Sequence, residues 1–282
     1  MSDTVWGDYE TAWCPGCGNF PLIKAVKKAL TDAGLAPEKV LFVSGIGQAA
    51  KAPHYLNCNL FNGLHGRGLA VATGAKLANP GLKVVYESGD GCTYGEGGNH
   101  FLTALRRNVS VTALVHDNQI YGLTKGQASP TSQEGLVTKA QPGGVLSSPV
   151  NPVALAVTLG ASFVARGFVM EIDHLASLIV EALEVDGFAL VDILQPCVTF
   201  NKVNTYKWYK ERCYRLGEDH DPEDAGAAMR AAREWGDRIP IGVIYRGLRQ
   251  GFESRIGALA GGPLAGRAPD PEKLAHIIDR YA

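Results

Sequence analysis

The sequence predicts an α/β fold: a doubly wound, mostly parallel sheet that is covered by helices on both faces. Three observations lead to this prediction. The chain has 282 residues, of which 46% are hydrophobic, so it can bury the core of one large domain. Several short apolar runs lack the polar–apolar alternation of half-exposed strands, as expected for strands buried on both faces. Segments with helical spacing of apolar residues separate these runs.

The predicted strands are rich in β-branched residues, and they span residues 40–43, 84–86, 109–115 and 188–194. The predicted helices repeat apolar residues three and four positions apart, and they span residues 20–35, 68–78, 98–106, 152–159 and 172–183. The first helix follows Asn19, a favourable N-cap residue. Because strands and helices alternate, ligands are expected beyond the carboxyl ends of the strands.

Two stretches depart from this alternation. Residues 126–149 have no clear periodicity, which is typical of a functional or mobile loop. The pattern weakens again after residue 196, and residues 253–270 are rich in Gly, Ala and Pro. We therefore expect a ligand-binding domain over residues 1–200 and an irregular, partner-contacting C-terminal arm and tail over residues 201–282.

The charge balance excludes two classes of partner. With 27 Lys and Arg against 28 Asp and Glu, the net charge is −1, which favours neither nucleic acid nor an anionic membrane. The basic and aromatic residues of 202–215 are followed at once by an acidic run. No apolar run reaches the roughly 18 residues of a membrane span, and the N-terminus lacks a secretion signal. We expect a soluble, cytoplasmic protein.

The segment Gly89-Asp90-Gly91 follows a predicted strand, where a phosphate-binding turn is expected. Glycine lets backbone N–H groups approach diphosphate oxygens, and Asp90 can bind a divalent cation, although such a triplet alone can also be a simple tight turn. Asn118 ends the next strand, with 26 residues between it and Gly91. Asp90, Asn118 and the carbonyl of Ile120 would suit Mg²⁺ together with two phosphate oxygens.

These residues resemble the signature of thiamine-diphosphate enzymes, a GDG triplet followed later by Asn. More narrowly, the chain resembles the beta subunit of 2-oxoacid:ferredoxin oxidoreductases over about residues 10–215. The segments that carry this resemblance are GDGCTYGEGGNH, RRNV, HDNQIYGLTKGQASPTS, SGIGQ and LHGRG. It implies a sheet of the thiamine-diphosphate-binding type, with residues 1–200 as the domain that binds the cofactor and Mg²⁺.

The resemblance also implies which residues line the cofactor. The diphosphate would be contacted by His65, Gly66, Gly89, Asp90, Gly91, Cys92, Gly122, Leu123 and Thr124. Residues Ser44, Gly45, Ile46 and Gly47 would lie near the reactive thiazolium ring, with Ile46 and Gly47 beside the reacting atoms. A histidine between glycine-rich turns, such as His65, can also be structural.

Six cysteines in a cytosolic chain indicate metal or redox chemistry rather than disulfides. Cys14 and Cys17 form a CxxC pair before the first helix, which fits a redox pair, a zinc site or an iron–sulfur site. A redox pair would follow the first strand of a βα unit, and zinc would need a second pair at the right spacing. The resemblance implies that CxxC, a central cysteine and Cys197 in a PC motif bind one [4Fe–4S] cluster.

The central ligand is where this chain departs from the family pattern. The family commonly has GIGC, whereas this chain has Gln48, and an amide is a poor ligand for a thiophilic cluster. We expect Cys58, ten residues further on, to supply the missing thiolate; a non-cysteine ligand or no cluster are the alternatives. Cys92 is expected to pack near the substrate, and Cys213 to be structural.

The resemblance implies a reversible, coenzyme A-dependent oxidative decarboxylation of a 2-oxoacid, with electrons passing through the cluster to ferredoxin and the reverse reaction fixing CO₂. The Glu that activates thiamine would come from an alpha subunit, so we expect a heterodimer or a dimer of heterodimers that is inactive without its partner. Lys125 could bind the second carboxylate of 2-oxoglutarate, or it could be a surface lysine. Pyruvate or a broad range of 2-oxoacids is the alternative substrate.

Two other classes of function remain open from the sequence. A non-redox thiamine-diphosphate decarboxylase or synthase would share the site around Asp90 and Asn118 but would have no use for the cysteines. An electron-transfer or zinc-binding module without catalysis would have no use for the magnesium–diphosphate residues. Iron content and thiamine-diphosphate binding distinguish these classes.

Overall fold

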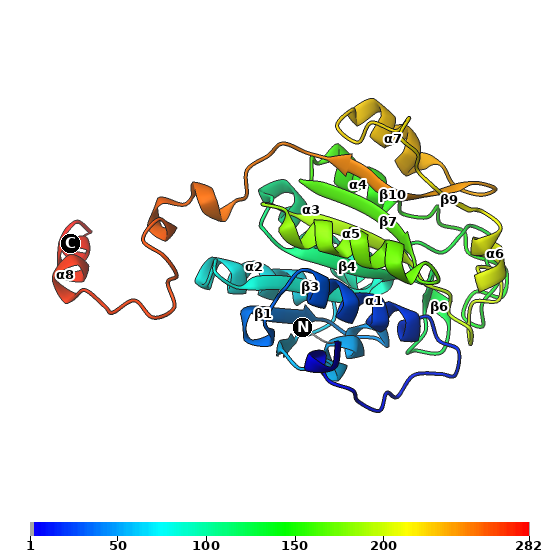
Figure 1. The fold of residues 1–282 in the computed structure, drawn as a ribbon, viewed down its shortest axis with the longest axis horizontal. Helices are drawn as coiled ribbons and strands as arrows, with labels where there is room; N and C mark the ends of the chain where they lie inside the picture. Colours follow the sequence, from blue (N-terminus) through cyan, green and yellow to red (C-terminus); the bar gives the residue numbers. More distant parts are fainter. Residues whose placement is uncertain (1–2, 282) are drawn as a thin grey trace.

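The computed structural model describes residues 3–281, and within them a single large sheet forms the centre of the molecule (Figure 1). Its eight strands lie in the order β2-β1-β3-β4-β8-β7-β10-β9. Among these described strands only the β7–β10 pair is antiparallel. The predicted fold class, a mostly parallel α/β sheet, is therefore confirmed.

The strands of this sheet are β1 (Val40–Ser44), β2 (Asn59–Asn62), β3 (Lys83–Gly89), β4 (Thr112–Asp117), β7 (Phe163–Phe168), β8 (Ala189–Leu194), β9 (Cys213–Arg215) and β10 (Ile239–Arg246). A separate small ribbon pairs β5 (Ile120–Tyr121) with β6 (Gln127–Ala128). Four of the central strands, β1, β3, β4 and β8, lie where the apolar runs predict them.

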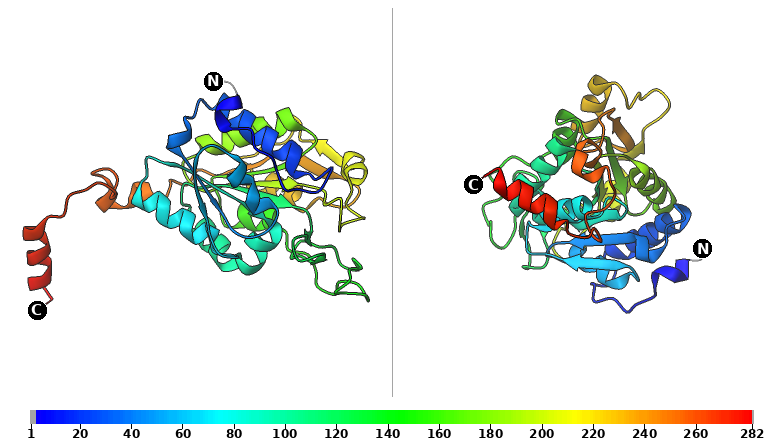
Figure 2. Two further views of the ribbon diagram at one scale, coloured as in Figure 1. Left: turned by 90° about the horizontal axis from the view of Figure 1, so that it is seen from below. Right: turned by 90° about the vertical axis from the view of Figure 1, so that its left-hand side faces the viewer.

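Helices cover both faces of the sheet (Figure 2). On one face, α1 (Asn19–Asp32) and α5 (Ile172–Glu184) pack against each other and over one hydrophobic cluster. On the other face lie α2 (Gly68–Ala78), α3 (Gly98–Arg107), α4 (Pro152–Thr158) and α7 (Ala225–Arg233), over a second cluster. The further helices are α6 (Tyr206–Lys210), α8 (Pro271–Asp279), the π-helical turn η4 (Gly91–Glu96), and the short 3₁₀ segments η1 (Asp3–Trp6), η2 (Pro37–Lys39), η3 (Ala49–Tyr55), η5 (Glu253–Arg255) and η6 (Gly257–Leu259).

The structure differs from the expected extent of the irregular arm. Residues 206–246 add α6, α7, β9 and β10 to the domain, and Tyr209, Ile239 and Ile241 are fully buried in its core. Their segments are short and separated by polar loops, so the sequence pattern there is weak. Irregular structure begins only after Arg246. Residues 247–253 are still bound to the body, where Arg249 donates to the Leu159 carbonyl and Glu253 accepts the Ser110 N–H. The chain then extends away from the body and ends in α8 (Figure 1).

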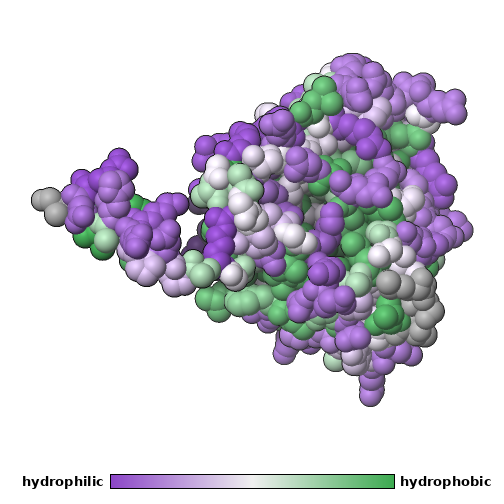
Figure 3. Space-filling view, turned by 60° about the vertical axis from the view of Figure 1, so that its left-hand side comes forward, coloured by the Kyte–Doolittle hydropathy of each residue, from purple (hydrophilic) through white to green (hydrophobic). Residues whose placement is uncertain are grey.

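Figure 3 shows this arm standing away from the body, with hydrophobic residues exposed both on the arm and on the body beside it. No residue of α8 is buried, and its apolar side chains Leu274, Ile277 and Ile278 are exposed. None of the described helices is both long enough and apolar enough to cross a bilayer.

Parallel pairing places the carboxyl ends of four central strands side by side. Ser44 of β1 is paired with Glu87 of β3, and Gly89 of β3 is paired with His116 of β4. Asp117, the last residue of β4, is paired with Leu194, the last residue of β8. The segments that follow these strands therefore meet at one edge, as the sequence predicts.

Candidate functional site

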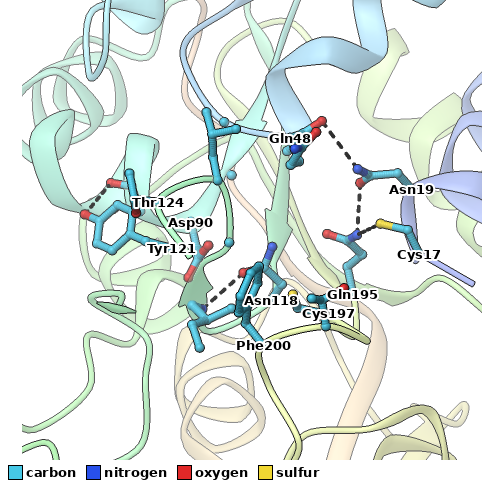
Figure 4. A pocket seen from close by; sticks show the side chains of 18 of the residues that line it. Cys17, Asn19, Gln48, Asp90, Asn118, Tyr121, Thr124, Gln195, Cys197 and Phe200 are labelled. Atoms are coloured by element: carbon cyan, nitrogen blue, oxygen red, sulfur yellow. Dashed lines mark hydrogen bonds between the residues drawn. The ribbon is translucent and has the colours of Figure 1, made fainter. Parts of the chain in front are cut away.

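A cavity lies at this edge of the sheet, and most of the predicted site residues line it (Figure 4). The predicted residues that line it are Cys14, Cys17, Ile46, Gly47, His65, Gly89, Asp90, Gly91, Cys92, Asn118, Ile120, Gly122, Leu123, Thr124 and Cys197. Five predicted residues are not part of this lining: Ser44, Gly45, Cys58, Gly66 and Lys125. The lining also includes residues that sequence reasoning did not select, among them Asn19, Tyr121 and Gln195.

Asp90 is the buried carboxylate of the cavity, with 2% of its surface exposed. Its Oδ2 accepts hydrogen bonds from Ser129 Oγ at 2.5 Å and from Thr131 Oγ1 at 2.7 Å. Burial raises the pKa of Asp90, because a charged carboxylate loses its hydration, while the two hydroxyls oppose this rise. No sequence pattern indicates that Ser129 and Thr131, in the long loop after β6, hold this carboxylate.

Asn118 and Ile120 complete a set of oxygen donors beside Asp90. Asn118 Oδ1 accepts the backbone N–H of Ile120 at 3.1 Å, which turns the chain into the cavity after β4. Asn201 Nδ2 donates to the Asn118 carbonyl at 3.1 Å and fixes the turn from outside. A carboxylate, an amide oxygen and a backbone carbonyl on one cavity are the hard donors that Mg²⁺ prefers, so these residues fit a magnesium–diphosphate site.

Cys92 holds two of the predicted cofactor loops together. Its Sγ accepts backbone N–H groups from Ile46 at 3.4 Å and from Gly66 at 3.2 Å. A Cβ at Gly45 would collide with this sulfur, so glycine is required there for the close approach. Gly45 and Gly66 thus contact the cavity residue Cys92, although they do not line the cavity themselves.

His65 and Ser44 are held by polar partners near the same loops. His65 Nε2 lies 3.4 Å from Glu96 Oε2, and its ring meets Tyr121 edge-on. Ser44 Oγ accepts Asn62 Nδ2 at 2.9 Å, and Ser44 is fully buried at the end of β1. Only His65 of this pair faces the cavity, which suits it to contact a bound anion.

The cysteine side of the cavity is formed by Cys14, Cys17 and Cys197. Burial raises the pKa of the Cys17 thiol, and the neighbouring thiols of Cys197 and Cys14 add to this rise. Gln195 Nε2 donates to Cys17 Sγ at 3.6 Å and to Asn19 Oδ1 at 2.9 Å. Asn19 is therefore a buried member of this network, and the prediction that it caps α1 is wrong: α1 begins at Asn19 itself, without a side-chain cap.

Cys58 lies elsewhere. It comes just before β2, and since β2 runs parallel to β1 with Asn59 beside Leu41, Cys58 lies at the amino end of β1. Its thiol reaches the backbone of Phe42 in the middle of β1 but is not part of the cavity lining, which follows the carboxyl end of that strand. Cys58 packs against the hydrophobic cluster beneath α1, and burial raises its pKa to about 12. This position argues against the expectation that Cys58 joins the other three thiols.

Within residues 3–281, no three His, Cys, Asp or Glu side chains are grouped closely enough to hold a single metal ion. The predicted magnesium residues include only one carboxylate, so they do not form such a group. A cluster of several irons and sulfides holds its thiolates farther apart than a single ion does. The three cavity cysteines therefore fit three corners of an iron–sulfur cluster, and among the described residues no cysteine fits the fourth.

Comparison with known proteins agrees with this geometry. Residues 42–193 match the family described as thiamine pyrophosphate enzyme, C-terminal TPP binding domain, and residues 197–261 match the C-terminal family of pyruvate ferredoxin oxidoreductase beta subunits. The chain is 46% identical over 264 residues to subunit beta of 2-oxoacid:ferredoxin oxidoreductase 1 from Aeropyrum pernix, covering 89% of this chain and 82% of that subunit. It belongs to the beta subunits of the 2-oxoacid:ferredoxin oxidoreductases.

This beta subunit is also 41% identical over 235 residues to the 2-oxoglutarate synthase subunit KorB of Archaeoglobus fulgidus, covering 79% of this chain and 86% of that subunit. A solved 2-oxoglutarate:ferredoxin oxidoreductase from Magnetococcus marinus, with 2-oxoglutarate, coenzyme A and succinyl-CoA bound, matches it with a TM-score of 0.91 and 37% identity. That match covers 98% of this chain and 96% of the solved chain.

Membership in this family makes the chain a subunit of an oxidoreductase, with a thiamine-diphosphate-binding domain and a partner subunit in a larger complex. It decides against the non-redox and the non-catalytic alternatives that the sequence left open. The predicted resemblance to this family is confirmed.

Proposed function

We propose that this beta subunit, together with an alpha subunit, performs the reversible, coenzyme A-dependent oxidative decarboxylation of 2-oxoglutarate, with electrons passing to ferredoxin. One observation carries the proposal. The oxygen donors Asp90, Asn118 and Ile120 line the same cavity as the thiols of Cys17 and Cys197. A diphosphate site and an iron–sulfur site that share one cavity are what coupled decarboxylation and electron transfer require.

Thiamine diphosphate, when bound, supplies the electron sink for loss of CO₂ from a 2-oxoacid. Asp90, Asn118 and Ile120 would hold Mg²⁺ and through it the diphosphate, while Gly89 and Gly91 let backbone N–H groups approach the phosphate oxygens. Ser129 and Thr131 keep Asp90 oriented toward the metal.

The remaining predicted residues would act on the reacting end of the cofactor and on the cluster. Ile46 and Gly47 line the cavity, and they would shield the reacting atoms from water. Cys14, Cys17 and Cys197 would hold an iron–sulfur cluster on the other wall of the cavity. Because both sets of residues line one cavity, this arrangement suits one-electron transfer out of the site.

The choice of 2-oxoglutarate over pyruvate is supported by the names of relatives and by Lys125. Lys125 lies in the turn of the β5–β6 ribbon, exposed, immediately after the cavity residue Thr124. Its φ of 72° is costly for a residue with a side chain, and such strain is concentrated at functional sites. An ammonium group at the cavity rim would pair with the second carboxylate of 2-oxoglutarate. Pyruvate or a broad range of 2-oxoacids is the competing assignment.

The alpha partner is required because activation of thiamine needs a glutamate beside the aminopyrimidine ring, which we assign to that subunit. A heterodimer or a dimer of heterodimers in the cytoplasm is the proposed form. The C-terminal arm would contact the partner, since α8 exposes the apolar side chains of Leu274, Ile277 and Ile278, and exposed Tyr281 follows shortly after the helix. Removing residues 263–282 should weaken subunit association in size-exclusion chromatography and leave the Tm of the body unchanged; a lowered Tm with intact association would contradict this role.

The test is to produce the beta subunit with its alpha partner, purify the complex without oxygen, and assay iron, acid-labile sulfide and ferredoxin reduction. We expect reduction that depends on both 2-oxoglutarate and coenzyme A, and no activity from the beta subunit alone. Iron-free complex that still binds thiamine diphosphate, or full activity without the alpha subunit, would contradict the proposal.

A further inference from the structure

Two side-chain oxygens of cavity-lining residues are buried without a hydrogen-bond partner: Oε1 of Gln48 and Oε1 of Gln195. Gln48 lines the cavity together with Cys14, Cys17 and Cys197. Burying an amide oxygen without a donor costs free energy, so such an atom calls for an explanation. A bound metal centre that the amide oxygen could coordinate would explain why this atom has no partner in the chain.

The position of Gln48 in the cavity is fixed by hydrogen bonds to its backbone carbonyl (Figure 4). Its carbonyl accepts Trp13 Nε1 at 3.0 Å and Asn19 Nδ2 at 3.4 Å. Asn19 Oδ1 in turn accepts Gln195 Nε2 at 2.9 Å, and the same Nε2 donates to Cys17 Sγ at 3.6 Å. An unbroken series of hydrogen bonds thus connects Gln48 to a cluster cysteine.

The competing fourth donor is Cys58, which is at the opposite end of β1 and has no place in the cavity lining. Cys92 lines the cavity, but its Sγ is already engaged by the N–H groups of Ile46 and Gly66. Gln195 lines the cavity too, but its Nε2 donates to Cys17 Sγ, which is the role of a residue that supports a ligand thiolate. Among the described residues, we therefore take the unpartnered oxygen of Gln48 as the fourth donor in the cavity of the three thiols.

We propose that this beta subunit holds its cluster with three thiolates, from Cys14, Cys17 and Cys197, and that Gln48 occupies the fourth corner. The inference rests on the proposed electron-transfer function and deepens it. An amide oxygen binds iron far more weakly than a thiolate does, so one iron of the cluster is held loosely. One iron of such a cluster would therefore differ from the other three: it could be lost while the three thiolate-bound irons remain.

The expected reaction is loss of that iron on one-electron oxidation. A [4Fe–4S]²⁺ cluster gives one electron to ferricyanide and releases Fe²⁺, which leaves [3Fe–4S]⁺ on the three cysteines, so charge and iron are both balanced. The four sulfides stay in the cluster, and ferricyanide is reduced to ferrocyanide. A cluster with four thiolate ligands resists this loss.

The experiment uses the anaerobically purified alpha–beta complex, treated with one equivalent of ferricyanide, with iron per complex and EPR spectra recorded before and after. Wild type should release about one iron per cluster and develop the EPR signal of a three-iron cluster. The variant Gln48→Cys should retain its iron under the same treatment, whereas Gln48→Ala should release iron more readily than wild type. Cys58→Ser should behave like wild type, and exposed Gln250→Cys controls for a thiol introduced outside the cavity.

The outcomes distinguish the assignment of the fourth ligand from the proposed function. If Cys58→Ser loses cluster iron, or if Gln48→Cys releases iron as wild type does, the assignment of the fourth corner is overturned while the proposed function stands. If no variant contains iron after oxygen-free purification, the proposed electron transfer fails, and the assignment with it. Should Gln48→Cys fail to fold, the pairing of an unchanged Cys58→Ser with a more labile Gln48→Ala still decides the question.

Discussion

The two sides of the cavity are built differently. On the magnesium side, Asp90 already has two hydroxyl partners and the Asn118 side-chain oxygen has a backbone donor. On the cysteine side, three thiols share the cavity with Gln48 and Gln195, whose side-chain Oε1 atoms are buried without a partner. The side-chain oxygens of Asp90 and Asn118 are therefore hydrogen-bonded within the chain, whereas the two amide oxygens on the cysteine side are not.

The origin of the two sides explains the difference. Asp90 and Asn118 follow neighbouring strands, β3 and β4, and the loop that carries Ser129 and Thr131 folds back onto them. The cysteine side gathers segments near residues 14–17, 48 and 195–197, which the parallel sheet brings together from far apart in sequence. The magnesium side is drawn from residues 90–131, whereas the cysteine side is drawn from residues 14–197.

The largest effect should come from removing the one carboxylate of the magnesium side. Asp90→Asn should weaken Mg²⁺-dependent binding of thiamine diphosphate by more than about 100-fold, since even the outer partners of a metal ligand contribute 10- to 100-fold. Isothermal titration calorimetry on the complex measures this. Exposed Asp219→Asn is the matched control, and binding of Asp90→Asn at wild-type strength would remove Asp90 from the site.

A smaller effect is expected from the hydroxyl that supports Asp90. Thr131 Oγ1 lies 2.7 Å from both Asp90 Oδ2 and Asp117 Oδ1, so Thr131→Val removes a polar contact from each carboxyl while keeping the side-chain shape. We expect Mg²⁺ affinity to fall about 10-fold or more. Thermal unfolding distinguishes this from a general loss of structure: an affinity loss that only accompanies a lower Tm would contradict a positioning role for Thr131.

Between the two sides, the turn carrying Lys125 should affect substrate choice rather than cofactor binding. Lys125→Ala should raise KM for 2-oxoglutarate about tenfold, the size expected for losing one charge-assisted hydrogen bond, and leave KM for pyruvate near its wild-type value. Steady-state kinetics on both substrates test this, with exposed Lys139→Ala in the loop after β6 as control. Equal changes for both substrates would refute the assignment.

The smallest effect on the site is expected from Cys58. Burial raises its pKa to about 12, so its thiol stays neutral at pH 8, and iodoacetamide labelling should be slow and rise about tenfold per pH unit up to pH 11. The same pKa shift affects the stability of the folded state. The neutral thiol contributes to stability fully below pH 9, and this contribution is lost as the pH rises toward 12. Mass spectrometry of the labelled protein measures the rates, and fast labelling at pH 8 would show that Cys58 is not buried as described.

Local patterns in the sequence were sufficient to predict the central strands and many of the residues that line the cavity. Runs of β-branched residues predict β1, β3, β4 and β8, because strands buried on both faces need apolar residues at every position. The glycine triplet at Asp90, the Asn118 spacing and the CxxC pair predict cavity residues because each signal lies in one short segment or in two successive strands. These features depend on neighbours in sequence.

Only the tertiary structure decided which distant groups complete the site. Ser129 and Thr131 reach Asp90 across 39 and 41 positions, and Gln195 reaches Cys17 across 178. The same holds for Cys58, which is close to Gln48 in sequence but lies at the other end of β1, and for β9 and β10, which join the sheet after a weak pattern. The physical reason is that hydrophobic periodicity indicates only which residues are buried. The polar partner of a residue depends on where the folded sheet places the ends of its strands.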